Sequence, residues 1–109
     1  MAKVEAAGFV IRRGRSFADL EKKAPALVAE MRQDLTKNPL VREFIILSKK
    51  VTYMGSGKLI FMYFLEEHEN LRGIVDVMLN YGAIFDVSFN KVPRYNFRED
   101  FVEYLVSPA

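Results

Sequence analysis

The chain has 109 residues, half of them apolar and 13% aromatic, and its sixteen basic and fourteen acidic residues give a net charge of +2. This length leaves room for one core, and the apolar fraction disfavours intrinsic disorder. The weak net charge does not by itself favour nucleic acid or an anionic membrane as a partner, and the absence of cysteine excludes disulfides, thiolate metal sites and thiol catalysis.

The sequence also bears on the cellular compartment. Lys3 and Glu5 interrupt the apolar N-terminus, which disfavours a signal peptide. The longest uncharged apolar run, Leu59 to Leu65, has seven residues, whereas a membrane-spanning helix needs about 20. A small secreted scaffold without disulfides would be unusual. We therefore expect a soluble cytoplasmic protein with no membrane partner.

Two segments are expected. Residues 1 to 15, which carry the basic residues Arg12, Arg13 and Arg15, are predicted to form an N-terminal arm or a first edge strand. Residues 16 to 109 contain no linker, repeat or low-complexity tract. They are therefore predicted to form a single α+β domain.

The first periodic segment predicts a helix that reaches about Lys37. Ser16 and Asp19 resemble a capping box at its start, where a side-chain oxygen satisfies an unpaired amide. Pro25 predicts a kink or short break near residues 22 to 24, because proline cannot donate a hydrogen bond within a helix. Spacings of three and four place a row of apolar residues on one face: Phe17, Leu20, Ala24, Leu27, Met31 and Leu35.

Asn38 and Pro39 have the order of an N-cap followed by proline at the first helical position. They predict a second helix from Pro39 to about Lys50. The continuous apolar run from Phe44 to Leu47 leaves a buried strand open as an alternative.

The next segment predicts a β-hairpin. Residues 51 to 54 and 59 to 65 are rich in β-branched and aromatic residues, and Gly55 to Gly57 would form the turn between them. A helix over residues 58 to 66 is the alternative. The turn followed by Lys58 resembles the end of a phosphate-binding loop, but the first glycine and the hydroxyl residue of that motif are missing, so a hairpin turn is favoured.

Residues 66 to 81 again show helical periodicity, and Gly82 is predicted to end this helix in the left-handed conformation. Residues 83 to 89 alternate as in a half-buried strand. The residues predicted on its buried side are Phe85, Val87 and Phe89, and those predicted on the opposite side are Ile84, Asp86 and Ser88.

A turn over residues 90 to 93 and a return strand over residues 94 to 97 would complete a second hairpin, with Pro93 confined to a turn or an edge. Asn96 and Glu99 are predicted to cap a short closing helix. The buried side of that helix would consist of Phe101, Val102 and Leu105.

The order helix, Gly82, two-stranded ribbon and closing helix over residues 67 to 106 resembles the recognition helix and wing of a winged-helix domain. The predicted fold is therefore α+β, with N-terminal helices, antiparallel hairpins and a winged-helix-like C-terminal half. A four-stranded antiparallel sheet covered by helices is the alternative that the same elements allow.

No catalytic constellation is recognisable. His68 lies among Glu66, Glu67 and Glu69, a cluster that could offer a general base or metal ligands, but carboxylates in the first turn of a helix are already explained by its dipole. A ligand pocket would need polar aromatic residues such as Tyr53 and Tyr95 to converge with His68. We expect no enzymatic activity, no metal and no cofactor.

The leading functional hypothesis is a non-catalytic binding module that contacts nucleic acid through its basic arm and ribbon. The helix over residues 66 to 81 carries four acidic residues and Arg72 alone, so it is not expected to enter a groove. The alternative is a protein-interaction or assembly domain that self-associates through apolar helix or strand faces. The candidate nucleic-acid contacts are Arg12, Arg13, Arg15, Lys91, Arg94 and Arg98.

Overall fold

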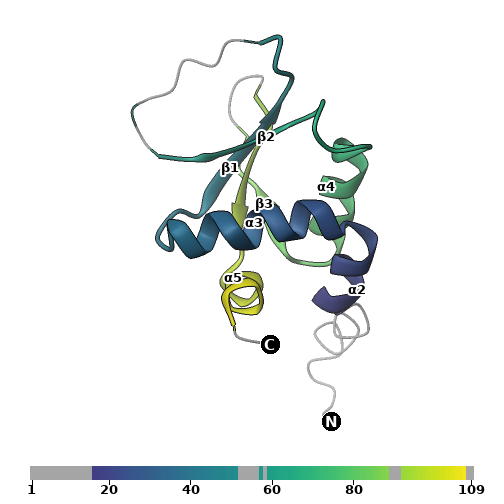
Figure 1. The fold of residues 1–109 in the computed structure, drawn as a ribbon, viewed down its shortest axis with the longest axis vertical. Coiled ribbons are helices and arrows are strands. Elements are labelled where there is room, and N and C mark those ends of the chain that lie inside the picture. Colours follow the sequence, from purple (N-terminus) through teal and green to yellow (C-terminus); the bar gives the residue numbers. More distant parts are fainter. Residues whose placement is uncertain (1–15, 52–56, 58, 89–91, 108–109) are drawn as a thin grey trace.

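The structure is a computed structural model that describes residues 16–51, 57, 59–88 and 92–107. Four strands form one mixed sheet in the order β2-β1-β4-β3, and helices accompany it (Figure 1). The α+β class predicted from the sequence is thereby confirmed. The elements are α2 (Phe17–Lys23), α3 (Pro25–Lys37), β1 (Glu43–Leu47), β2 (Phe61–Phe64), α4 (Leu71–Asn80), β3 (Ile84–Asp86), β4 (Arg94–Phe97) and α5 (Glu99–Val106).

The first two helices follow the sequence closely. Ser16 is the N-cap of α2, and its side-chain oxygen accepts a hydrogen bond from the Asp19 amide at 3.2 Å. The break falls at Ala24, and Pro25 begins α3, where its missing N–H costs nothing. The predicted interruption of the helix is confirmed.

The predicted helix from Pro39 to about Lys50 is wrong, because this segment contains β1. All five residues of β1 are buried. A strand covered on both faces shows a continuous apolar run in place of alternation, so the run from Phe44 to Leu47 belongs to a central strand.

The predicted first hairpin is described only in its second strand. The strand expected over residues 59 to 65 exists as β2, but it pairs in parallel with β1, with Phe61 opposite Phe44. Residues 52–56, which include most of the predicted turn and first strand, lie outside the described residues. A parallel pairing requires a crossover connection, which a local turn signal does not reveal.

The second hairpin is confirmed, since β3 and β4 pair antiparallel. However, β4 also pairs antiparallel with β1, with Tyr95 opposite Phe44, so the ribbon is an integral part of the sheet. The winged-helix likeness is not confirmed. The alternative prediction of four strands holds, but its wholly antiparallel pairing does not.

Helix α4 begins five residues later than predicted. Asn70 has a φ of 56° and precedes the first helical residue, Leu71. Residues 66–69 form turns, in which Glu66 accepts hydrogen bonds from Ser48 and the Lys49 amide. Gly82 has a φ of 74°, so its predicted left-handed conformation is confirmed.

The predicted phase of β3 is wrong. Ile84 is 1% exposed and lies in the core, whereas Phe85 is only half-buried on the opposite side. The reason is the turn after α4: the Ala83 amide donates to Met78 O, which directs Ala83 and Ile84 together into the core. The residue Phe89 lies outside the described residues.

The closing helix α5 is confirmed, and the three residues predicted on its buried side are all in the core. Its predicted cap is wrong. Arg98 is the N-cap and makes no side-chain capping bond, while Asn96 lies within β4 and Glu99 is the first helical residue. Acidic residues in the first turn, Glu99 and Asp100, interact with the helix dipole instead.

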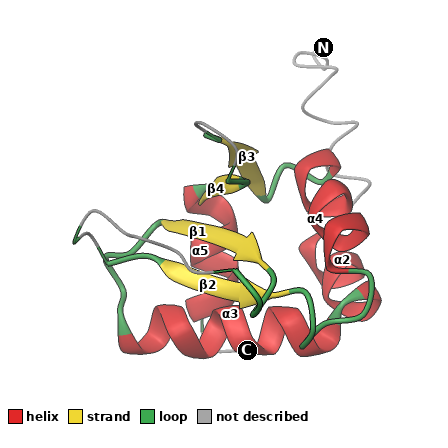
Figure 2. Ribbon diagram, turned by 90° about the horizontal axis from the view of Figure 1, so that it is seen from above, coloured by secondary structure: helices red, strands yellow, loops and turns green. Residues whose placement is uncertain are grey.

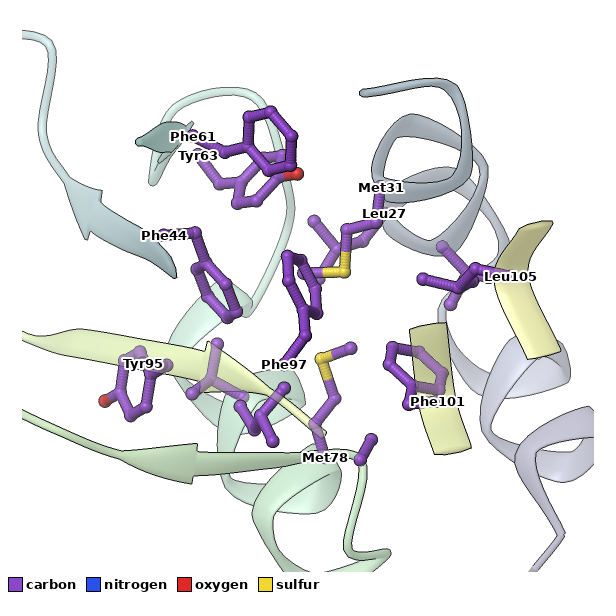
Figure 3. Close-up of a cluster of buried hydrophobic side chains, with 14 of the residues drawn as sticks. Leu27, Met31, Phe44, Phe61, Tyr63, Met78, Tyr95, Phe97, Phe101 and Leu105 are labelled. Atoms are coloured by element: carbon purple, nitrogen blue, oxygen red, sulfur yellow. The ribbon is translucent and has the colours of Figure 1, made fainter. Parts of the chain in front are cut away.

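The helices gather on one face of the sheet. All buried residues of the four described helices belong to one hydrophobic cluster, which also contains alternate residues of the strands. Figure 3 shows Phe97 of β4 near the centre of this cluster, with Leu27 and Met31 on one side and Phe44 on the other. Figures 1 and 2 place α3 and α5 beside the sheet and α2 and α4 together at one end of the molecule.

The opposite face of the sheet, here called the outer face, carries the alternate residues of each strand. None of them belongs to the cluster that the helices cover. Ile45 and Leu47 are nevertheless buried, whereas Met62 is 38% exposed. The residues of the outer face are Glu43, Ile45, Leu47, Met62, Phe64, Phe85, Arg94 and Asn96.

Candidate functional site

Two of the six candidate nucleic-acid contacts are among the described residues. Arg94 lies on the outer face, where its Nε atom is 3.0 Å from Glu43 Oε2. Glu43 is 9% exposed, so this carboxylate directly offsets the charge of Arg94. The second described candidate is Arg98. The other four lie outside the described residues: Arg12, Arg13, Arg15 and Lys91.

Arg98 has a different environment. It is exposed, and its guanidinium carbon lies 5.0 Å from the centre of the Phe85 ring, a cation–π geometry. Phe85 is on the outer face and half-buried. The structure therefore brings one candidate arginine together with an aromatic ring that sequence reasoning assigned to the core.

Three of the other described basic side chains form ion pairs with acidic ones. Closest approaches of 2.7 to 3.0 Å join Arg32 to Glu21, Arg42 to Glu99 and Lys49 to Glu67. The described residues hold ten basic and thirteen acidic side chains, so the six basic residues and one acidic residue that remain carry the positive surplus of the chain. The folded body described here is therefore net acidic, which disfavours a broad phosphate-binding surface on it.

His68 does not act together with the glutamates beside it in the sequence. Its Nε2 atom lies 2.6 Å from Glu30 Oε1 on α3, and the His68 side chain is 9% exposed. The described part of the chain contains no group of three or more histidine, aspartate or glutamate side chains placed to hold a metal ion. His68 thus links the turn before α4 to α3.

Two of the tyrosines are buried and take part in the packing of the fold. Tyr63 donates a hydrogen bond to Asp34 Oδ2 at 3.0 Å, and burial, followed by the charge of Asp34, raises the pKa of its hydroxyl. Tyr95 is buried in the core cluster, where desolvation raises its pKa. Tyr53 lies outside the described residues. No described contact joins Tyr95 to His68, so the ligand pocket considered from the sequence has no support.

A shallow hollow of about 610 Å³ runs along the exposed side of α3. All of its described lining residues come from this one helix: Ala26, Ala29, Glu30, Arg32, Gln33, Thr36 and Lys37. Because no polar groups from other described elements converge on it, the hollow does not have the construction of a small-molecule site.

Among the described strands, β2 lies at an edge of the sheet and has β1 as a neighbour on one side. The Leu65 amide donates a hydrogen bond to Leu47 O at 3.0 Å. This bond shows which residues of β2 have their backbone groups directed toward β1. In a parallel pair only alternate residues of a strand face a given neighbour, so Phe61 and Tyr63 face β1. The N–H and C=O groups of Met62 and Phe64 then point away from β1, on the side where the sheet has no further described strand.

The composition of this edge is unusual for one that remains exposed. Residues 59 to 65 include no charge and no proline, although natural edge strands commonly carry them to prevent pairing with other chains. Leu59 is 61% and Met62 is 38% exposed. We call residues 59 to 65 the β2 edge.

The opposite edge of the sheet is protected in the usual way. Strand β3 has only three residues and ends in Asp86, which is exposed. The Asp86 carboxylate accepts a hydrogen bond from the Ser88 amide at 2.7 Å, so the chain turns there. Short length and a charge both disfavour pairing of a further strand at β3.

Sequence reasoning found the β2 edge only in part. The apolar run was visible and suggested a docking surface, but its pairing with β1 was not predicted. Which backbone groups point away from β1 follows from the parallel register with β1, and the residues in that register are far apart in the sequence.

Comparisons of the chain with protein-family models, with curated proteins and with solved structures found no match. Within the described residues no helix combines the length and apolarity needed to cross a bilayer. The longest of them, α3, has thirteen residues.

Proposed function

We propose that this chain is a protein-interaction domain that binds an extended segment of another polypeptide along the β2 edge. The observation that carries the proposal is the row of outward backbone groups at Met62 and Phe64, on an edge strand without charge or proline. A strand added to such an edge gains affinity from main-chain hydrogen bonds.

The side chains of the edge would add selectivity. Met62 and the half-buried Phe64 project from the outer face beside the outward backbone groups. An added strand would place alternate side chains next to them, and methionine adapts readily to such neighbours. An apolar segment is therefore the partner that this edge favours.

The distribution of charge supports this function over nucleic-acid binding. A nucleic-acid surface needs basic groups on one face without nearby carboxylates. On the described residues Arg94 faces Glu43, and Lys49 faces Glu67. An exposed apolar edge requires no such surplus of positive charge.

Site-specific photo-cross-linking in cells of the source organism tests the proposal. A photoreactive side chain at Leu59, which is 61% exposed, should capture a defined polypeptide. Met62→Pro should abolish that product, because proline removes an outward N–H while the bonds from β2 to β1 stay intact. The measurement is the yield of the cross-linked band with and without Met62→Pro.

Two controls make the result specific. A photoreactive side chain at the exposed Gln33 of α3 should give products that Met62→Pro does not change. Circular dichroism should show that Met62→Pro retains the wild-type fold. A Leu59 product of equal yield in the folded proline variant would show that the β2 edge does not bind the partner.

A nucleic-acid-binding module is the second candidate, and one observation favours it. The exposed Arg98 lies over the half-buried ring of Phe85, which is on the outer face. Such pairs can stack on unpaired bases while the guanidinium contacts phosphate. This function would also depend on Arg12, Arg13 and Arg15, which contribute much of the positive surplus of the chain.

A further inference from the structure

We infer that the polypeptide bound at the β2 edge is a second copy of this chain, paired antiparallel about Met62 to make one continuous sheet of both copies. This inference rests on the proposed function and adds the identity of the partner. It is an isologous contact, in which the same surface serves both copies.

The first argument is the symmetry of the edge. The uncharged run from Leu59 to Leu65 has Met62 at its centre, and Met62 is one of the residues whose backbone groups face outward. A two-fold axis at Met62 pairs it with its own copy and pairs Ile60 with Phe64. Every outward residue of the run then meets another outward residue, as a hydrogen-bonded antiparallel pair requires.

The second argument is the charge beyond the run. Glu66 and Glu67 follow the β2 edge directly, and both are exposed. A parallel pairing of two copies would bring these carboxylates side by side, which is unfavourable. The antiparallel pairing places them at opposite ends of the new ladder, so the charges disfavour the competing arrangement.

The third argument is that the other edge among the described strands, at β3, is a poor site for strand addition. Because the β3 edge is short and ends in the exposed Asp86, addition at β2 alone closes the assembly at two copies. When an edge strand pairs with its own copy, the edge is used up in both chains, so further chains cannot add to the sheet there. A dimer is therefore the expected product.

Single cysteines test the geometry, since the chain has none of its own. In the inferred dimer the two copies of residue 62 have their Cα atoms about 5.5 Å apart, which is within the range that a disulfide spans. The two copies of residue 59 would be six residues apart along the ladder, or about 20 Å. Leu59→Cys is a stringent control because Leu59 is more exposed than Met62 and should react more readily in random collisions.

The expected result is a disulfide-linked dimer of Met62→Cys that forms at least about tenfold faster than that of Leu59→Cys, because the pairing raises the local thiol concentration. Light scattering of the wild-type chain at several hundred micromolar should approach twice its mass of 12.6 kDa. The folded Met62→Pro variant should remain at the single mass. High concentration is chosen because a strand-to-strand contact is narrower than a standard interface.

A monomeric wild-type chain under these conditions, or equal rates for the two cysteine variants, would overturn the inference. If the cross-link at Leu59 in cells still depends on Met62 but joins a different polypeptide, the second copy is excluded and the interaction function stands. If no cross-link depends on Met62, both proposals fail.

Discussion

Glu21, Arg32 and Tyr104 form a network that joins three helices. The Glu21 carboxylate accepts hydrogen bonds from Arg32 at 3.0 and 3.2 Å and from the Tyr104 hydroxyl. Arg32 Nε also donates to Leu105 O at 2.8 Å. The network therefore ties α2 and α3 to the C-terminal end of α5, where carbonyl groups lack partners within the helix.

This network predicts a stability that depends on pH. The bond from Arg32, followed by the bond from Tyr104, lowers the pKa of Glu21 below its ordinary value of 4.5. The stabilisation is then complete above about pH 4.5 and is lost as the pH falls through the folded pKa. Glu21→Gln should lower the free energy of unfolding by about 1 kcal/mol at pH 7, a modest value because the pair is partly exposed.

Urea denaturation of Glu21→Gln and wild type across a pH series measures this effect. The difference between the two proteins should shrink as the pH drops below 4.5 and disappear once native Glu21 is protonated. A difference that stays constant down to acidic pH would show that the charge of Glu21 contributes nothing.

At the scale of the element, the phase of β3 gives different environments to Phe85 and Phe101, which the sequence pattern predicts to be buried alike. Phe101 of α5 is completely buried and packs against Phe97, with ring centres 6.3 Å apart. Phe85 is half-buried beneath Arg98 on the outer face. Phe101→Ala should therefore cost about 3–5 kcal/mol of stability, because it leaves a cavity in the core.

Phe85→Ala should cost far less, about 1 kcal/mol, because the half-buried ring loses less buried area and leaves no enclosed cavity. Thermal melts of the two variants make the comparison. Equal losses in melting temperature would mean that Phe85 is in the core after all and that the phase of β3 described above is incorrect.

At the scale of the whole molecule, the positive surplus lies in residues outside the described part of the chain, so a test of nucleic-acid binding should remove basic residues there. Changing Arg12, Arg13 and Arg15 to alanine takes the formal charge from +2 to −1. If the second candidate function holds, this variant should bind all sequences more weakly and show a flatter dependence of affinity on salt. Arg72→Ala is the matched control and should change little.

Fluorescence anisotropy with single-stranded and duplex oligonucleotides measures these affinities. No binding by the wild-type chain at about 50 mM salt, where phosphate contacts are strong, would exclude this function. A loss confined to Arg72→Ala would instead indicate that α4 contacts the nucleic acid.

The sequence by itself determined the features that depend on neighbouring residues. Ser16 as a cap, the break at Pro25 and the left-handed Gly82 follow from restrictions on φ and from bonds that span only a few residues. The buried side of α5 follows from its helical period alone. These signals lie within one or two turns of the chain.

Only the tertiary structure decided the identity of β1, the parallel pairing of β2 and the phase of β3. Each depends on contacts between residues that are distant in the sequence, such as Phe44 with both Phe61 and Tyr95. Local propensity cannot report whether a strand is covered on both faces or which of its backbone groups remain unpaired. The β2 edge is therefore visible in the sequence as an apolar run, but its position as the outermost described strand, with β1 on one side, follows only from the tertiary structure.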